Sequence, residues 1–87
     1  MKVVNDIDAR LKSIIIKNAK AEITNEDIND NSDFIGDFGY DSISIMQIII
    51  DVEKEFSMQF DDNDLHLANL GNYGRLKSYI LRKVPLL

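Results

Sequence analysis

The sequence predicts an all-α domain built as a bundle of four helices. Three segments place apolar residues at intervals of three and four, the spacing of a helix with one buried side. The stretches between them are rich in Asn, Asp, Ser and Gly, and no stretch shows the alternation typical of a strand. With 87 residues, 45% hydrophobic and 29% charged, the chain has material for one modest core. We therefore expect a single domain over residues 1–87.

The first helix is expected over roughly residues 6–19. Its inward-facing positions share helical spacing and are Val4, Ile7, Leu11, Ile14, Ile15 and Asn18. Asn5 is placed to cap the helix, and Asp6 and Asp8 fall in the first turn, where the helix dipole favours acidic side chains. Lys17 lies near the other end, where the dipole favours a positive charge.

Residues 21–40 lose this periodicity and are expected to form a long first loop. A loop of this length in a small domain is usually functional or held against the core. The apolar residues available to hold it are Ile23, Ile28, Phe34, Ile35 and Phe38.

A second helix is expected to begin at Asp41 or Ser42 and to end near Phe56 or Ser57. One of its faces carries Ile45, Ile48, Ile49, Val52 and Phe56, and a different face carries Ile43, Met46 and Ile50. A helix that is apolar on two sides is either buried all round or divided between core and contact surface. Full burial is difficult in a domain this small, so the second face is a candidate docking patch.

The third helix is expected to be short, with Asp61 capping its start and its end near Leu67 or Ala68. Asn72 is placed to cap a fourth helix, which ends before Pro85 because proline does not continue a helix. The inner face of this fourth helix is expected to carry Tyr73, Leu76, Tyr79 and Ile80.

Charge is unevenly distributed along the chain. Residues 22–64 contain thirteen Asp and Glu against one basic residue, Lys54, a net charge of −12, whereas the two ends carry nine Lys and Arg against two acids, a net charge of +7. An acidic segment of this size repels the phosphate backbone, so nucleic acid is disfavoured as a partner and the chain is not expected to be a helix-turn-helix DNA-binding protein. A protein partner with a basic patch is favoured. The alternative is an acidic face that is merely solvated.

Several other classes of protein are disfavoured by composition. The chain has no cysteine, so it contains neither a disulfide framework nor a thiolate of its own. No apolar run is long enough to cross a bilayer, and the N-terminus reaches acidic residues before any signal-peptide core forms. We expect a cytoplasmic protein.

The segment of residues 32–43, Ser-Asp-Phe-Ile-Gly-Asp-Phe-Gly-Tyr-Asp-Ser-Ile, resembles the prosthetic-group site of acyl and peptidyl carrier proteins. In that family an Asp-Ser-Leu or Asp-Ser-Ile triplet follows a Leu-Gly-type turn and opens the second helix, as Asp41, Ser42 and Ile43 do here. The helix that follows, the acidic turn at residues 61–64 and the closing apolar pattern also match, so the resemblance covers nearly the whole chain.

This resemblance implies that Ser42 carries 4'-phosphopantetheine, transferred from coenzyme A by a phosphopantetheinyl transferase. A phosphodiester at the start of a helix lies near unpaired backbone N–H groups and the positive end of the dipole. Asp41 is expected to cap the helix and, by resemblance, to help the transferase recognise the site, and Gly39 to let the loop approach the helix closely. The arm's thiol would hold acyl, aminoacyl or polyketide intermediates, and the chain itself would catalyse nothing.

The resemblance also implies partners, namely acyl-transferring or condensing enzymes with basic docking patches, met by a monomeric carrier. The matching surface positions are Ile43, Met46, Gln47, Ile50, Glu53, Lys54, Asp62 and Asp64. Fatty-acid carriers usually place acids just after the serine and near the positions of Gln47 and Lys54, and this chain does not. A polyketide, nonribosomal-peptide or other specialised pathway is therefore at least as well supported as fatty-acid synthesis.

Other readings of the same residues are weaker. Asp27, Asn29 and Asn31 resemble the start of a calcium loop, but Ser32 and Phe38 stand where that loop needs Gly and Glu, so no metal site is expected. Ser42 with His66 and an Asp lacks the surroundings of a hydrolase triad, so no catalytic residue is expected. An unmodified helical interaction module that docks through the second apolar face remains the alternative function.

Overall fold

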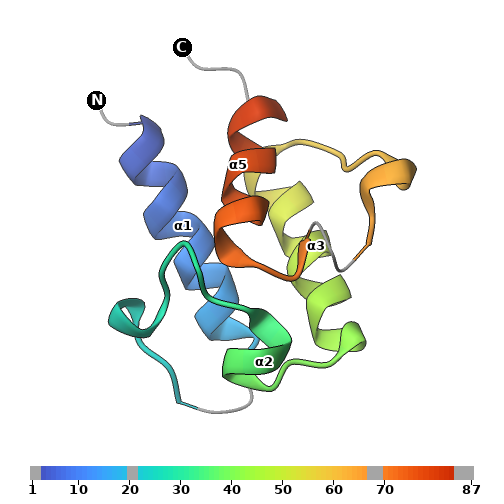
Figure 1. Cartoon of the computed structure of the whole chain (residues 1–87). Coiled ribbons are helices and arrows are strands. Elements are labelled where there is room, and N and C mark those ends of the chain that lie inside the picture. Colours follow the sequence, from blue (N-terminus) through green and yellow to red (C-terminus); the bar gives the residue numbers. More distant parts are fainter. Residues whose placement is uncertain (1–2, 20–21, 67–69, 84–87) are drawn as a thin grey trace.

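The computed structural model describes residues 3–19, 22–66 and 70–83, and every regular element in these ranges is a helix (Figure 1). The α-helices are α1 (Val3–Lys17), α2 (Phe34–Phe38), α3 (Ser42–Phe56) and α5 (Tyr73–Lys83), with short 3₁₀ turns η1 (Asn25–Asp27) and η2 (Asp62–Asp64). Extended pairing within the described residues is limited to one isolated bridge between Asp33 and Asn72. The predicted all-α, four-helix class is confirmed.

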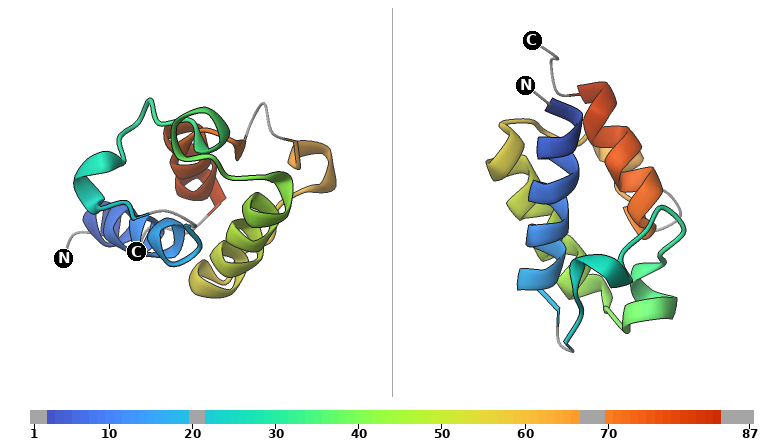
Figure 2. Two further views of the ribbon diagram at one scale, coloured as in Figure 1. Left: turned by 90° about the horizontal axis from the view of Figure 1, so that it is seen from below. Right: turned by 90° about the vertical axis from the view of Figure 1, so that its left-hand side faces the viewer.

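The three long helices surround one core. α1 runs antiparallel to α3 and α5 and packs against both (Figure 1). The short α2 lies at the end of the molecule where α3 begins, as the two views of Figure 2 show. This arrangement places the first turn of α3, with Ser42, at an exposed corner of the bundle.

The core is the apolar surface that the sequence pattern predicted. α1 contributes four residues from the predicted stripe, α3 contributes its first apolar face, and α5 contributes its predicted inner face. These buried residues are Ile7, Leu11, Ile14, Ile15, Ile45, Ile48, Ile49, Val52, Phe56, Tyr73, Leu76, Tyr79 and Ile80. Since burial of such side chains stabilises by about 1.5–3 kcal/mol each, this set accounts for the packing of the three long helices.

The bounds of α1 differ from the prediction. The helix begins at Val3, so Asn5 lies inside it and the proposed N-cap is wrong. Acidic and polar residues suit the first turn of a helix as well as its cap, and the pattern therefore did not fix the start. The helix ends at Lys17, and the Asn18 side chain then donates to the Ile14 carbonyl oxygen at 2.9 Å.

The prediction that residues 21–40 form one irregular loop is also wrong, because η1 and α2 lie within it. At the start of α2 the Asp33 carboxylate accepts a hydrogen bond from the Gly36 N–H at 2.7 Å. Five residues are too few for helical periodicity to be visible in the sequence. Of the expected anchors, Ile28 and Phe34 are buried and Ile23 and Phe38 partly so, whereas Ile35 is 45% exposed and anchors nothing.

Of the expected third helix, the described residues contain the 3₁₀ turn η2. Its predicted end at residues 67–68 lies outside the described residues. Asp61 precedes the turn but its side chain makes no capping hydrogen bond; the carboxylate instead pairs with the Lys83 ammonium at 2.9 Å. α5 follows the prediction, since the Asn72 side-chain oxygen accepts from the Arg75 N–H at 3.0 Å at its start.

Candidate functional site

Ser42 is the first residue of α3 and its side chain is exposed. The preceding residue, Asp41, has extended backbone geometry, and its carboxylate accepts a hydrogen bond from the Ser44 N–H at 2.8 Å. The predicted cap is confirmed. Because the Asp41 carboxylate satisfies the third N–H of the helix, the Ser42 hydroxyl is not needed for capping, and no hydrogen bond joins it to any other residue within the described ranges.

The segment that leads into Ser42 is held firmly. Gly39 ends α2 with a φ of 73°, a left-handed conformation that glycine adopts without strain. A side chain at Gly39 would meet no atom within 4 Å, so its role is this backbone turn and not the close approach expected from the sequence. Next in the chain, the Tyr40 ring is buried and its hydroxyl donates to the Ile15 carbonyl oxygen; burial raises the pKa of Tyr40 to about 12.

A cavity of about 150 Å³ opens directly beside Ser42. Its lining is mostly apolar and comes from α3 and from the chain between η2 and α5. The lining residues are Ser42, Ile45, Met46, Ile49, Leu65, His66 and Leu70. Leu65, His66 and Leu70 were not predicted to line a site at Ser42, because their contact with α3 joins parts of the chain that are distant in sequence.

His66 shares this cavity with Ser42. Its ring Nε2 lies 2.7 Å from the Asn63 carbonyl oxygen. Within the described residues no hydrogen bond joins the ring to the Ser42 hydroxyl, which is the direct contact of a general base. The exposed serine has the accessibility that an attachment point needs.

The second apolar face of α3 is exposed, as the sequence predicted. Ile43 is 79% exposed, Met46 48% and Ile50 40%. Gln47 and Lys54 are also exposed along this side of the helix. We call the row formed by Ile43, Met46, Gln47, Ile50 and Lys54 the α3 strip. It starts one residue beyond Ser42 and runs the length of the helix.

The predicted surface acids do not all lie free beside the strip. The Glu53 carboxylate accepts a hydrogen bond from the Phe60 N–H at 3.0 Å, and the Asp64 carboxylate accepts from the Tyr79 hydroxyl at 2.9 Å. Both therefore help to position the chain that follows α3. Asp62 is exposed on η2. Ser44, which stands where fatty-acid carriers usually have an acid, is buried.

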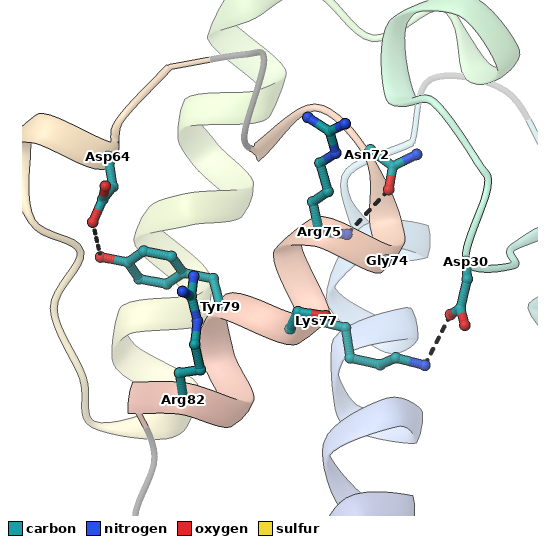
Figure 3. A pocket seen from close by; sticks show the side chains of 9 residues that line it. Asp30, Asp64, Asn72, Gly74, Arg75, Lys77, Tyr79 and Arg82 are labelled. Atoms are coloured by element: carbon teal, nitrogen blue, oxygen red, sulfur yellow. Dashed lines mark hydrogen bonds and ion pairs between the residues drawn. The ribbon is translucent and has the colours of Figure 1, made fainter.

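A wider depression of about 840 Å³ lies over α5, away from Ser42 (Figure 3). The charged groups that line it are largely engaged with one another. The Lys77 ammonium pairs with Asp30 at 2.9 Å, the Tyr79 hydroxyl donates to Asp64, and the Arg82 guanidinium lies 5.3 Å from the centre of the Tyr79 ring. The contacts of Lys77 and Tyr79 hold α5 to the first loop and to η2. We therefore interpret this surface as one that stabilises the fold.

Comparison with known proteins agrees with the geometry of the Ser42 corner. A family model for the phosphopantetheine attachment site matches residues 9–80. The chain belongs to the acyl carrier protein family. An acyl carrier protein from Thermotoga maritima is 30% identical over 79 residues, which cover 91% of this chain and 93% of that protein. Two from Buchnera aphidicola, from the Schizaphis graminum and Acyrthosiphon pisum subspecies, are 30% and 32% identical over 66 residues, 76% of this chain and about four-fifths of each relative.

Membership of this family brings a covalently attached 4'-phosphopantetheine. The chain's own residues fit such a group, because an exposed serine hydroxyl stands at the start of a fifteen-residue helix. The N–H groups of the first turn and the helix dipole favour an anionic phosphodiester there.

Features of two other classes of protein are absent from the described ranges. Within the described residues no helix is long and apolar enough to cross a membrane. No group of three His, Cys, Asp or Glu in those same ranges is arranged to hold a metal ion. The calcium-like motif instead supports local turns, since the Asn29 side-chain oxygen accepts from the Asn31 N–H at 2.9 Å.

Proposed function

We propose that this protein is a non-catalytic acyl carrier whose prosthetic group is attached to Ser42. The supporting observation is the Ser42 corner itself: an exposed hydroxyl on a capped helix, with an apolar cavity on one side and the exposed α3 strip on the other. When attached, 4'-phosphopantetheine supplies the thiol that holds the cargo as a thioester. Asp41 keeps the helix start formed, and Tyr40 fixes the segment before it.

The cavity beside Ser42 is proposed to shelter the end of the cargo. The cavity has a volume of about 150 Å³ and a mostly apolar lining that includes Ile45, Ile49 and Leu70, which suits an apolar group at the end of the cargo.

The proposed pathway is fatty-acid, polyketide or a related specialised biosynthesis. The proposed partners are a phosphopantetheinyl transferase and acyl-transferring or condensing enzymes, whose basic groups would meet exposed acids such as Asp62 on η2. The absence of acids at Ser44, Gln47 and Lys54 favours a specialised pathway. We further propose that the carrier is a cytoplasmic monomer of one domain.

Transfer in vitro tests the attachment site. The full chain is incubated with coenzyme A and the phosphopantetheinyl transferase of the organism that encodes it, and the intact mass is measured. The wild type and a Ser13→Ala control, which alters another exposed serine, should each gain one phosphopantetheine group. Ser42→Ala should gain none while keeping the wild-type thermal melt. A modified Ser42→Ala chain, or an unmodified wild type, contradicts the proposal.

A second candidate function is that of an unmodified interaction module. The exposed apolar strip supports it, because such a strip can bind a protein with or without a prosthetic group. Replacing the chromosomal copy with Ser42→Ala separates the two. A carrier loses pathway output completely while the protein remains folded and abundant. An interaction module retains its output.

A further inference from the structure

The acidic residues of α3 are engaged within the molecule, and this decides what its exposed side offers a partner. α3 carries three carboxylates, those of Asp51, Glu53 and Glu55. Each contacts α1 or the segment after α3, so none extends from the α3 strip.

Asp51 faces α1. Its carboxylate accepts a hydrogen bond from the Asn18 side chain at 3.0 Å and lies 3.4 Å from the Lys17 ammonium, and its side chain is only 16% exposed. The exposed Gln47 amide, 3.4 Å from the other carboxylate oxygen, partly covers it from the strip side. Asp51 is therefore both neutralised and shielded.

Glu55 and Glu53 are likewise engaged. The Glu55 carboxylate pairs with the Arg10 guanidinium of α1 at 2.7 Å, and the same guanidinium donates to the Glu55 backbone carbonyl oxygen. Glu53 accepts from the Phe60 N–H. The charge of Glu55 is thus offset by Arg10, whereas the Glu53 carboxylate keeps its charge but is directed to the segment that follows α3.

Unlike the acids of α3, the residues of the α3 strip are exposed and carry no negative charge. Ile43, Gln47, Ile50 and Lys54 follow one another at intervals of four, three and four residues, which places them in one row on the helix surface. The row is apolar beside Ser42 and ends in an exposed ammonium. Lys54 forms no ion pair with any residue in the described ranges, so its charge is available to a partner.

From this we infer that the α3 strip docks on an enzyme surface that offers an apolar recess for Ile43 and Ile50 and a carboxylate opposite Lys54, in place of a basic patch along α3. This inference rests on the proposed function, because it takes docking beside Ser42 as the carrier's task. Burial of the two isoleucines supplies the affinity, and the ion pair at Lys54 sets the register along the helix. Basic groups of the partner would instead meet exposed acids outside α3, such as Asp62 on η2.

Steady-state kinetics of the host organism's phosphopantetheinyl transferase tests this inference, with coenzyme A and the full chain as substrates. The strip variants are Ile43→Ala and Lys54→Glu. Each has a matched control outside the strip: Ile35→Ala, which also truncates an exposed isoleucine, and Arg82→Glu, which makes the same charge change in the last turn of α5. Thermal melts establish that all four variants are folded.

We expect kcat/KM to fall about tenfold in each strip variant, through KM, and to stay within about twofold in both controls. A rise in kcat/KM for Lys54→Glu, or unchanged rates for both strip variants, overturns the docking inference and leaves Ser42 as the attachment site. If the transferase modifies no form of the chain, the proposed function fails and the docking inference fails with it.

Discussion

The two sides of this small bundle are built differently. Between α1 and α5, Tyr73 is buried and its hydroxyl donates to Asp8, whose carboxylate also meets Lys12 and Lys77. Lys77 continues to Asp30 in the first loop. On the outer side of α3, by contrast, three large apolar side chains face solvent beside an accessible serine.

The contacts between α1 and α5 therefore hold the fold together, whereas the exposed side of α3 is available to partner proteins. Burial and the Asp8 hydrogen bond raise the pKa of Tyr73, so the phenol stays a donor and the link between α1 and α5 persists over the ordinary pH range. Just before α3 the buried Tyr40 hydroxyl makes a comparable link to the Ile15 carbonyl oxygen, but the Ser42 side chain that follows it is exposed. A carrier needs this combination, because its serine must be reached by several enzymes in turn while the helix that presents it stays fixed.

The largest expected effect comes from comparing two isoleucines on the two faces of α3. Ile48 is fully buried and Ile43 is 79% exposed. Ile48→Ala should lower the free energy of unfolding by about 2–5 kcal/mol, and Ile43→Ala should change it by no more than about 0.5 kcal/mol. Urea denaturation followed by circular dichroism measures both. Equal losses would show that the strip is part of the core and not a surface.

A second comparison uses two glycines. A Cβ added at Gly74 would lie 2.5 Å from the Asp30 backbone oxygen, whereas Gly39 has open space around it but a φ of 73°. Gly74→Ala should cost about 1–3 kcal/mol because loop and helix must separate, and Gly39→Ala about 1–2 kcal/mol from backbone strain alone. Only the Gly74 variant should also speed hydrogen exchange at the Asp30 end of the loop. Faster exchange in the Gly39 variant than in the Gly74 variant would contradict a loop held to α5 by the contact between Gly74 and Asp30.

The smallest effect concerns the acids of α3. The hydrogen bond from Asn18, helped by the charge of Lys17, lowers the pKa of Asp51 below its ordinary value. Its contribution is therefore complete above the unfolded pKa and is lost as pH falls through the lower folded pKa. We expect this loss to be about 1 kcal/mol or less. Below about pH 4 the urea midpoint of the wild type should fall more steeply with pH than that of Asp51→Asn. Parallel curves for the two proteins would mean that Asp51 is not held by α1.

The sequence predicted what depends on long periodic segments. α3 and α5 begin within a residue of expectation because each combines a helical stripe with a polar cap, at Asp41 and Asn72. The exposure of Ile43, Met46 and Ile50 also followed from periodicity, since one helix in a domain of this size cannot bury two apolar faces.

What the sequence did not predict depends on contacts between distant residues. α2 is only five residues long and was missed. The pairing of Glu55 with Arg10 joins residues 45 positions apart, and no local pattern marks it. The cavity beside Ser42 likewise needs Leu65 and Leu70 to fold back onto α3. These contacts convert a helix with three acids into one whose exposed strip carries none.

The most direct test of the central claim is to locate the modification on protein purified from its own organism. Trypsin releases the stretch between Lys20 and Lys54, which contains Ser32, Ser42 and Ser44, and fragmentation by mass spectrometry assigns the modified serine. We predict phosphopantetheine on Ser42 alone, since Ser32 and Ser44 are buried. An unmodified peptide throughout growth, or phosphopantetheine on either of the other two serines, would contradict the account.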